Sequence, residues 1–190
     1  MLRTAHWCPF YCLSSLVGRW ALWTLLSEKT NPEEELTFAV DLLNCVVEGV
    51  TGVKTGLHVC RSNWSQQETV LLQGAYDQLI PYFSRMQVHQ LVLEYATERA
   101  GSVEALQDLP PAMEIGLGVC NPRSTDLEPV DFVVNKVKTL LQYRTPEQIY
   151  LNPDCGFGTF AERPVNTMAV AANKLQIIHQ AAEALRHEYA

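Results

Sequence analysis

Apolar residues along the chain fall into two patterns, short continuous runs and longer segments with helical spacing. The continuous runs predict strands near 55–60, 88–96, 113–120 and 148–154, since a strand covered on both faces of a sheet is apolar throughout. Helical spacing predicts helices over about 31–50, 66–85, 129–142 and 166–187, with a short helical or loop crossover over 101–109. This alternation of strand and helix predicts four βα units with parallel strands.

The first predicted helix has a distinct start and one apolar face. Asn31 can cap it, Pro32 suits its first turn, and the acidic residues at 33–35 favour the positive end of the helix dipole. Gly49 and Gly52 end it. The face predicted to be buried comprises Leu36, Ala39, Val40, Leu43, Val46, Val47 and Val50.

Residues 1–30 lack this periodicity. They hold three of the four tryptophans, Trp7, Trp20 and Trp23, and the stretch 4–18 has no charged residue before Arg19 interrupts it. That stretch is shorter than the roughly 20 apolar residues that cross a bilayer. We therefore expect an N-terminal extension outside the core at 1–30, a folded domain over 31–190, and no contact with a membrane.

Four βα units are too few for a closed barrel, which needs eight units and typically about 250 residues. The pattern thus leaves two architectures, a small open α/β sheet or half of a barrel. The strands near 55–60 and 148–154 are then expected at two open edges, with an apolar inner face exposed to water. Such surfaces favour association, so we expect self-association, aggregation, or coverage of the open side by residues 1–50.

Composition excludes some partners. The formal net charge is −7, from 14 basic and 21 acidic residues, without the basic stripe that binding to nucleic acid requires. The six cysteines are scattered, and a chain of this length and apolar content needs no disulfide framework. We therefore expect a reducing, cytoplasmic compartment.

Potential metal ligands lie at the carboxyl ends of three predicted strands. His58 and Cys60 are two positions apart, so a strand places both on one face. Glu94 is an acid within an apolar strand, where it needs a partner. Cys155 begins a tight turn before Gly156. Because ligands of parallel βα folds bind at the carboxyl ends of strands, these side chains predict one site.

One nitrogen, two sulfurs and one oxygen form a suitable tetrahedral shell for zinc. The sequence therefore predicts a Zn²⁺ site made by His58, Cys60, Glu94 and Cys155. Cys120 ends an equivalent strand and is the alternative fourth ligand. Asp154, next to Cys155, is expected to support the ligands without binding the ion.

Several segments together resemble the catalytic C-terminal barrel of the cobalamin-independent methionine synthase family. The likeness runs from about residue 35 to 186, with the motifs in the family's order. They are His58-Val59-Cys60-Arg61-Ser62-Asn63-Trp64, Leu93-Glu94-Tyr95-Ala96, Gly116-Leu117-Gly118-Val119 and Leu151-Asn152-Pro153-Asp154-Cys155-Gly156-Phe157. The resemblance implies the second half of a (β/α)8 barrel and a zinc ion held by His58, Cys60, Glu94 and Cys155.

The resemblance also implies an activity, transfer of a methyl group from 5-methyltetrahydrofolate to the zinc-bound thiolate of homocysteine, which forms methionine. Two departures leave alternatives open. The family carries a proton-handling histidine after the strand that ends at Cys120, where this chain has Arg123. The first half of the barrel, with its residues for the amino acid, has no counterpart. The alternatives are a zinc-binding fragment without turnover and a zinc-dependent thiol alkyltransferase with another acceptor or donor.

Overall fold

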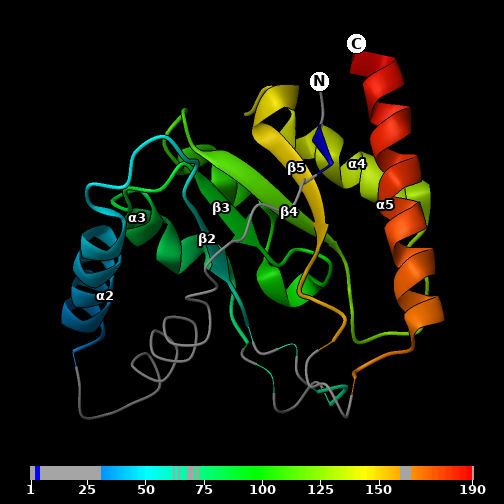
Figure 1. Cartoon of the computed structure of the whole chain (residues 1–190), viewed down its shortest axis with the longest axis horizontal. Coiled ribbons are helices and arrows are strands. Elements are labelled where there is room, and N and C mark those ends of the chain that lie inside the picture. Colours follow the sequence, from blue (N-terminus) through cyan, green and yellow to red (C-terminus); the bar gives the residue numbers. More distant parts are fainter. Residues whose placement is uncertain are drawn as a thin grey trace.

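The computed structural model describes residues 3–4, 31–61, 63, 65–67, 71, 73–158 and 164–189. Within these residues one parallel sheet has five strands in the order β1-β5-β4-β3-β2 (Figure 1). The strands are β1 (Arg3–Thr4), β2 (Gly56–Val59), β3 (Gln90–Leu93), β4 (Glu114–Cys120) and β5 (Ile149–Pro153). Parallel pairing of the four strands predicted from the sequence is confirmed.

Helices connect these strands. The α-helices are α2 (Pro32–Val47), α3 (Ile80–Phe83), α4 (Val130–Leu140) and α5 (Met168–Tyr189). The 3-10 helices are η2 (Tyr76–Leu79), η3 (Glu98–Ala100), η4 (Val103–Asp108) and η5 (Pro146–Gln148). In Figure 1, α2 and α3 lie towards the β2 edge of the sheet, and α4 and α5 towards β5. Among the described residues, none of the helices is both long and apolar enough to cross a membrane.

The two faces of the sheet differ in chemistry. Paired residues of parallel strands share a face, so Leu57, Leu91 and Ile115 form one apolar row across β2, β3 and β4. These side chains belong to the buried core that the helices cover. The core also takes in Leu36, Val40 and Leu43 of α2, Val133, Val137 and Leu140 of α4, and Ala181, Ala182 and Leu185 of α5.

The opposite face is polar and rich in glycine, so the prediction of an apolar inner face is wrong. One row across it pairs Gln90 of β3 with Glu114 of β4. Lys54 donates to both oxygens of Glu114 at 2.6 Å and to the hydroxyl of Tyr150 at 3.0 Å. Strand alternation sends every second residue of an apolar run to this face, and most of those residues are glycine or polar, Val92 being an apolar exception.

The strand at residues 148–154 is not the open edge that was predicted, and at this edge the structure agrees with the expected alternative of coverage by residues within 1–50. Arg3 and Thr4 form β1, which pairs with Tyr150 and Leu151 on the outer side of β5. β2 lies at the other end of the strand order, as predicted. Residues 1–2 and 5–30 lie outside the described part of the chain, so the predicted boundary of the extension stays a prediction.

Two helix predictions need correction. The helix expected over 66–85 is only η2 followed by the single turn α3 among the described residues. Gly74 has a φ of +119°, outside the helical region, and the Tyr76 hydroxyl instead bonds to the sheet at Val59 O and Glu94 N. In α2 the cap at Asn31 is confirmed, but the buried face ends at Leu43: Val46, in the last turn, is 50% exposed, and Val50, beyond the end of the helix at Val47, is 44% exposed.

Candidate metal centre

β2 supplies a histidine and a cysteine to one site. His58 faces away from the apolar core row, because it alternates with the buried residues Leu57 and Val59. Its Nδ1 lies 3.1 Å from the carbonyl of Val92 on β3. With the ring proton on Nδ1 donated to that carbonyl, Nε2 is left as the atom that can bind a metal.

Glu94 follows β3 and is 2% exposed. Its Oε1 accepts a 2.9 Å hydrogen bond from the backbone N–H of Arg61, and its Oε2 lies 3.1 Å from Arg99. Its own N–H donates to the Tyr76 hydroxyl. The carboxylate predicted to need a partner is thus held by an arginine and by the loop that follows Cys60.

Cys155 is placed by the turn that follows β5. Its Sγ lies 3.2 Å from Glu94 Oε1, 3.3 Å from Cys60 Sγ and 3.4 Å from His58 Nε2. The preceding residue, Asp154, is buried and accepts a 2.9 Å hydrogen bond from the N–H of Ala96.

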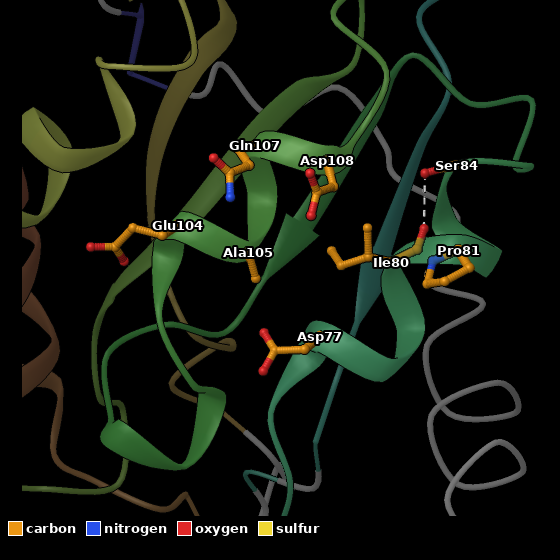
Figure 2. Close-up of a pocket in the computed structure, with 8 residues that line it drawn as sticks. All are labelled: Asp77, Ile80, Pro81, Ser84, Glu104, Ala105, Gln107 and Asp108. Atoms are coloured by element: carbon orange, nitrogen blue, oxygen red, sulfur yellow. Dashed lines mark hydrogen bonds between the residues drawn. The ribbon is translucent and has the colours of Figure 1, made fainter.

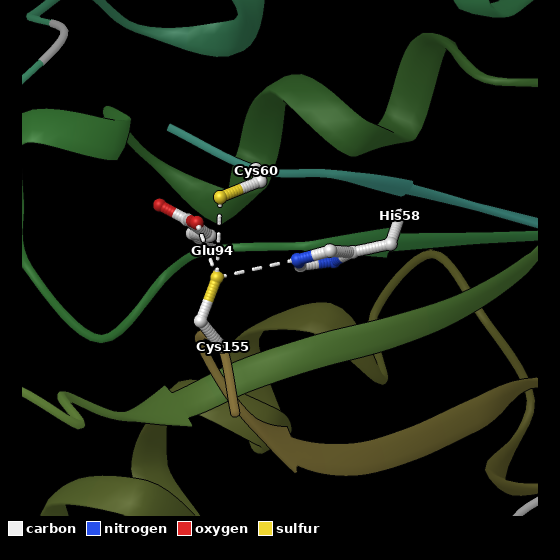
Figure 3. Close-up of side chains that lie close together, drawn as sticks. All are labelled: His58, Cys60, Glu94 and Cys155. Carbon is white, nitrogen blue, oxygen red and sulfur yellow. Dashed lines mark hydrogen bonds between the residues drawn. The ribbon is translucent and has the colours of Figure 1, made fainter. Parts of the chain in front are cut away.

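The four predicted ligands therefore converge at one end of the sheet (Figure 3). One potential ligand atom from each lies within 4.8 Å of all the others. Among the described residues, this is the one group of three or more His, Cys, Asp or Glu side chains so placed. The set offers two sulfurs, one nitrogen and one oxygen, the donors that zinc accepts. That a metal is bound here stays a prediction.

Protonation of the cluster reflects burial and close contact. The hydrogen bond to Cys60, burial and the charge of Glu94 all raise the pKa of the Cys155 thiol. Burial, with the nearby charges of Asp154 and Cys60, raises the pKa of Glu94 to about 7. Burial works to lower the pKa of His58, but contact with Cys60, the charge of Glu94 and the hydrogen bond to the carbonyl of Val92 together raise it. Without a metal, these groups hold protons that a cation would displace.

Cys120, the alternative ligand, is not in this group. Its side chain is fully buried in the core, and its Sγ lies 3.8 Å from the carbonyl oxygen of Lys174. Burial raises the pKa of its thiol. A register shift in the pairing of β4 with β5 falls between Gly118 and Cys120, so strand-end position alone does not predict the direction of this side chain. The four cysteines of the described residues form no disulfide.

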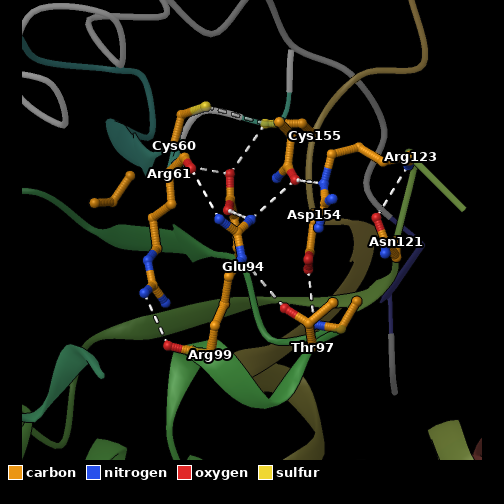
Figure 4. A network of polar contacts seen from close by, with 12 residues as sticks. Cys60, Arg61, Glu94, Thr97, Arg99, Asn121, Arg123, Asp154 and Cys155 are labelled. Carbon is orange, nitrogen blue, oxygen red and sulfur yellow. Dashed lines mark hydrogen bonds and ion pairs between the residues drawn. The ribbon is translucent and has the colours of Figure 1, made fainter. Parts of the chain in front are cut away.

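The sequence did not indicate which polar side chains lie around Glu94 (Figure 4). Arg99 contacts Glu94 and also donates to Asn63 Oδ1 at 3.0 Å. Arg123 donates to the same oxygen at 2.6 Å. Asn63, Arg99 and Arg123 each follow the carboxyl end of a strand, which is a usable signal. Their contacts could not be predicted, because Asn63 lies 36 residues from Arg99 and 60 residues from Arg123 along the chain.

A second region holds acidic residues but no metal-ligand group. A surface hollow of about 460 Å³ lies between η2, α3 and η4 (Figure 2). Asp77, Glu104 and Asp108 line it, and they do not form a group close enough to hold one ion. It contains none of the four clustered residues, so the convergence at the sheet end remains the candidate site.

Comparison with known proteins assigns the family. Residues 21–184 match the family described as cobalamin-independent synthase, catalytic domain. A methionine synthase of Pyrococcus horikoshii is 32% identical over 178 residues, which cover 93% of this chain and 47% of that protein. A methionine synthase of Thermococcus kodakarensis is 32% identical over 160 residues, covering 84% and 42%. The chain belongs to the cobalamin-independent methionine synthase family and spans less than half the length of these relatives.

The fold agrees with this assignment. A B12-independent methionine synthase from Shewanella sp. W3-18-1, solved in complex with selenomethionine, superimposes with a TM-score of 0.68 at 17% identity. The match covers 82% of this chain and 45% of that one. The prediction of parallel βα units that form part of a (β/α)8 barrel is confirmed.

Proposed function

We propose that this chain carries the zinc centre of a methyltransferase of the methionine synthase type. The reaction is transfer of a methyl group from 5-methyltetrahydrofolate to the sulfur of homocysteine, which forms methionine. The observation that carries the proposal is the convergence of His58, Cys60, Glu94 and Cys155 within 4.8 Å. Family membership supports the same class of reaction.

The donor set suits zinc and this chemistry. With two thiolates, a carboxylate and a neutral imidazole around a divalent ion, the site as a whole has a net charge of about −1. Zinc, when bound, lowers the pKa of a substrate thiol so that its nucleophilic thiolate forms near neutral pH. The chain's part is to hold the donors in place. A reducing compartment such as the cytoplasm would keep Cys60 and Cys155 as thiols.

The chain's own residues prepare the site in three ways. The carbonyl of Val92 fixes the ring of His58. The backbone N–H of Arg61 and the guanidinium of Arg99 hold the two oxygens of Glu94. Partial burial of Cys60 and Cys155 limits contact with water, which strengthens electrostatic interactions at the site.

Two measurements test the proposal. Metal analysis of the purified chain should find one zinc per chain. In the Co²⁺-loaded chain, homocysteine should change the visible absorption, because a further thiolate near the ion alters its ligand field, whereas serine should not. A chain that takes up no metal, or a Co²⁺ spectrum indifferent to homocysteine, would overturn the proposal.

A second candidate is zinc binding without turnover, favoured because the chain spans 47% of its Pyrococcus horikoshii relative. Orientation of the reactants supplies a large part of the barrier reduction, and this chain alone is not expected to orient both. Methionine formation should be assayed with 5-methyltetrahydrofolate and homocysteine, and S-alkylation with other small thiols. A spectral response to homocysteine without product favours the zinc-binding fragment, and turnover of a different thiol favours another acceptor.

A further inference from the structure

The two carboxylate oxygens of Glu94 have different surroundings. Oε1 lies 3.2 Å from Cys155 Sγ and 2.9 Å from the backbone nitrogen of Arg61, so it faces the cluster. Oε2 lies 3.1 Å from Arg99 in an ion pair whose side chains are 1% and 6% exposed. Each carboxylate oxygen has two lone pairs, so Oε1 can bind an ion as well as the N–H of Arg61, whereas Arg99 holds Oε2 on its own side of the carboxylate. Glu94 is therefore arranged to offer one oxygen only.

Arg99 is itself held in place by several acceptors. Its guanidinium donates to the carbonyl of Arg61 at 3.0 Å and to Asn63 Oδ1 at 3.0 Å, in addition to Glu94. Its Nε also lies 3.4 Å from the Thr97 hydroxyl. The planar fork of arginine can satisfy such a set at once, whereas the point charge of lysine cannot.

Asn63 joins Arg99 to a second arginine. Its Oδ1 accepts from Arg99 at 3.0 Å and from Nε of Arg123 at 2.6 Å. Asn63 and Arg123 are 3% and 4% exposed. In this low-dielectric position, one amide oxygen held between two guanidiniums couples their positions.

Arg123 lies in the loop between β4 and α4, which is anchored to the C-terminal helix region. Glu128 accepts from the backbone N–H of Asn121 at 2.7 Å and from the buried Lys174 of α5 at 2.9 Å. Asn166 donates to the carbonyls of Pro122 and Ser124 at 2.8 and 3.0 Å. A continuous set of polar contacts thus runs from α5 through this loop to Glu94.

We propose that Arg99, fixed by Asn63 and Arg123, is a positioning residue that restricts Glu94 to one-oxygen coordination and couples the β4–α4 loop to the metal ligands. The inference rests on the metal site proposed above and extends it to residues that do not touch the ion. Without the guanidinium of Arg99, the carboxylate of Glu94 is free to rotate, and the affinity of the four ligands for the metal falls. Partners outside the ligand shell typically change metal affinity by about 10- to 100-fold.

The test compares charge-conserving variants of the full chain. Arg99→Lys keeps the positive charge and removes the fork. Its zinc affinity, measured by competition with a chromophoric chelator, should fall by about 10- to 100-fold. The visible bands of its Co²⁺ form should shift towards those of Glu94→Gln. Asn63→Ala should change both readouts in the same direction, by about 10-fold in affinity.

Two controls separate positioning from general damage. In a Glu94→Gln background neither Arg99→Lys nor Asn63→Ala should lower affinity further, because each acts through the carboxylate. Arg144→Lys alters another buried guanidinium, which donates to Leu106 O and Leu109 O away from the cluster, and should leave zinc affinity and the Co²⁺ spectrum unchanged.

The outcomes distinguish this inference from the function on which it rests. Unchanged affinity and spectrum in both Arg99→Lys and Asn63→Ala would overturn the positioning role while the metal site stands. An equal loss of affinity with and without the Glu94 carboxylate would also overturn it. A wild-type chain that binds neither zinc nor Co²⁺ would overturn the metal site and the positioning role together.

Discussion

The carboxylate of Asp154, at the end of β5, accepts a 2.9 Å hydrogen bond from the backbone N–H of Ala96, which follows β3. β4 lies between these two strands, so the side chain of Asp154 crosses it. The crossing point is Gly118, where an added Cβ would collide with the Asp154 carboxylate and lie 2.7 Å from the carbonyl of Leu93. One hydrogen bond thereby ties the segment of Cys155 to that of Glu94.

Gly118→Ala should destabilise the chain for this reason. Forcing a methyl group into a packed site typically costs about 1–3 kcal/mol, and we expect a loss of that size in urea unfolding together with weaker zinc binding. Gly158→Ala is the matched control, since a Cβ there meets nothing within 4 Å, and its effect should stay within about 0.5 kcal/mol. Equal stability of the two variants would contradict the crossing described above.

Substitution of single cysteines should distinguish Cys60 and Cys155, which belong to the cluster, from Cys120, which does not. Cys60→Ser and Cys155→Ser each replace a soft thiolate by a hydroxyl, a poor zinc ligand. Zinc affinity should fall by more than roughly 100-fold, which is the upper end of the effect of residues that contact ligands but not the metal. Cys120→Ser, in the core beside Lys174, should keep the zinc. Retention of zinc by Cys155→Ser with its loss in Cys120→Ser would show that the fourth ligand is Cys120.

Zinc binding should release protons. The pKa of Cys155 is raised, so its thiol is protonated at neutral pH in the metal-free chain, and the pKa of Glu94 is about 7. Because metal binding requires the deprotonated forms, affinity should increase as pH rises from about 6 to 8. Calorimetric titrations in buffers of different ionisation enthalpy should give at least one proton per zinc at pH 8, and more at pH 6.5. Affinity independent of pH would count against thiolate ligation.

Self-association is now expected through α2 rather than through β5. Leu42 and Val46 lie one turn apart on this helix and are 51% and 50% exposed, while β1 pairs with the outer side of β5. Leu42→Lys combined with Val46→Lys should reduce association in sedimentation experiments without loss of helical circular dichroism. Leu175→Lys on α5, also 51% exposed, is the control. A wild-type chain that stays monomeric at all concentrations would show that this surface makes no contact with a second copy.

The sequence by itself determined the order of the four strands β2 to β5, the start of α2 at Asn31 and the four residues of the cluster. These features depend on local physics. Apolar runs report burial, a capping side chain acts within its own turn, and His58 and Cys60 share a face because strand geometry has a period of two. Position at strand ends then predicted that Glu94 and Cys155 would join them, because parallel strands bring their carboxyl ends to one edge.

Only the tertiary structure decided how these residues are held and which ones join them. Arg99, Asn63 and Arg123 meet through contacts between different βα units, and no local pattern encodes which guanidinium reaches which carboxylate. The pairing of β1 with β5 joins residues about 147 positions apart. Cys120 shares the strand-end position of Cys60 but is directed into the core, because the register of β4 against β5 shifts beside it. Such outcomes depend on the packing of the whole sheet.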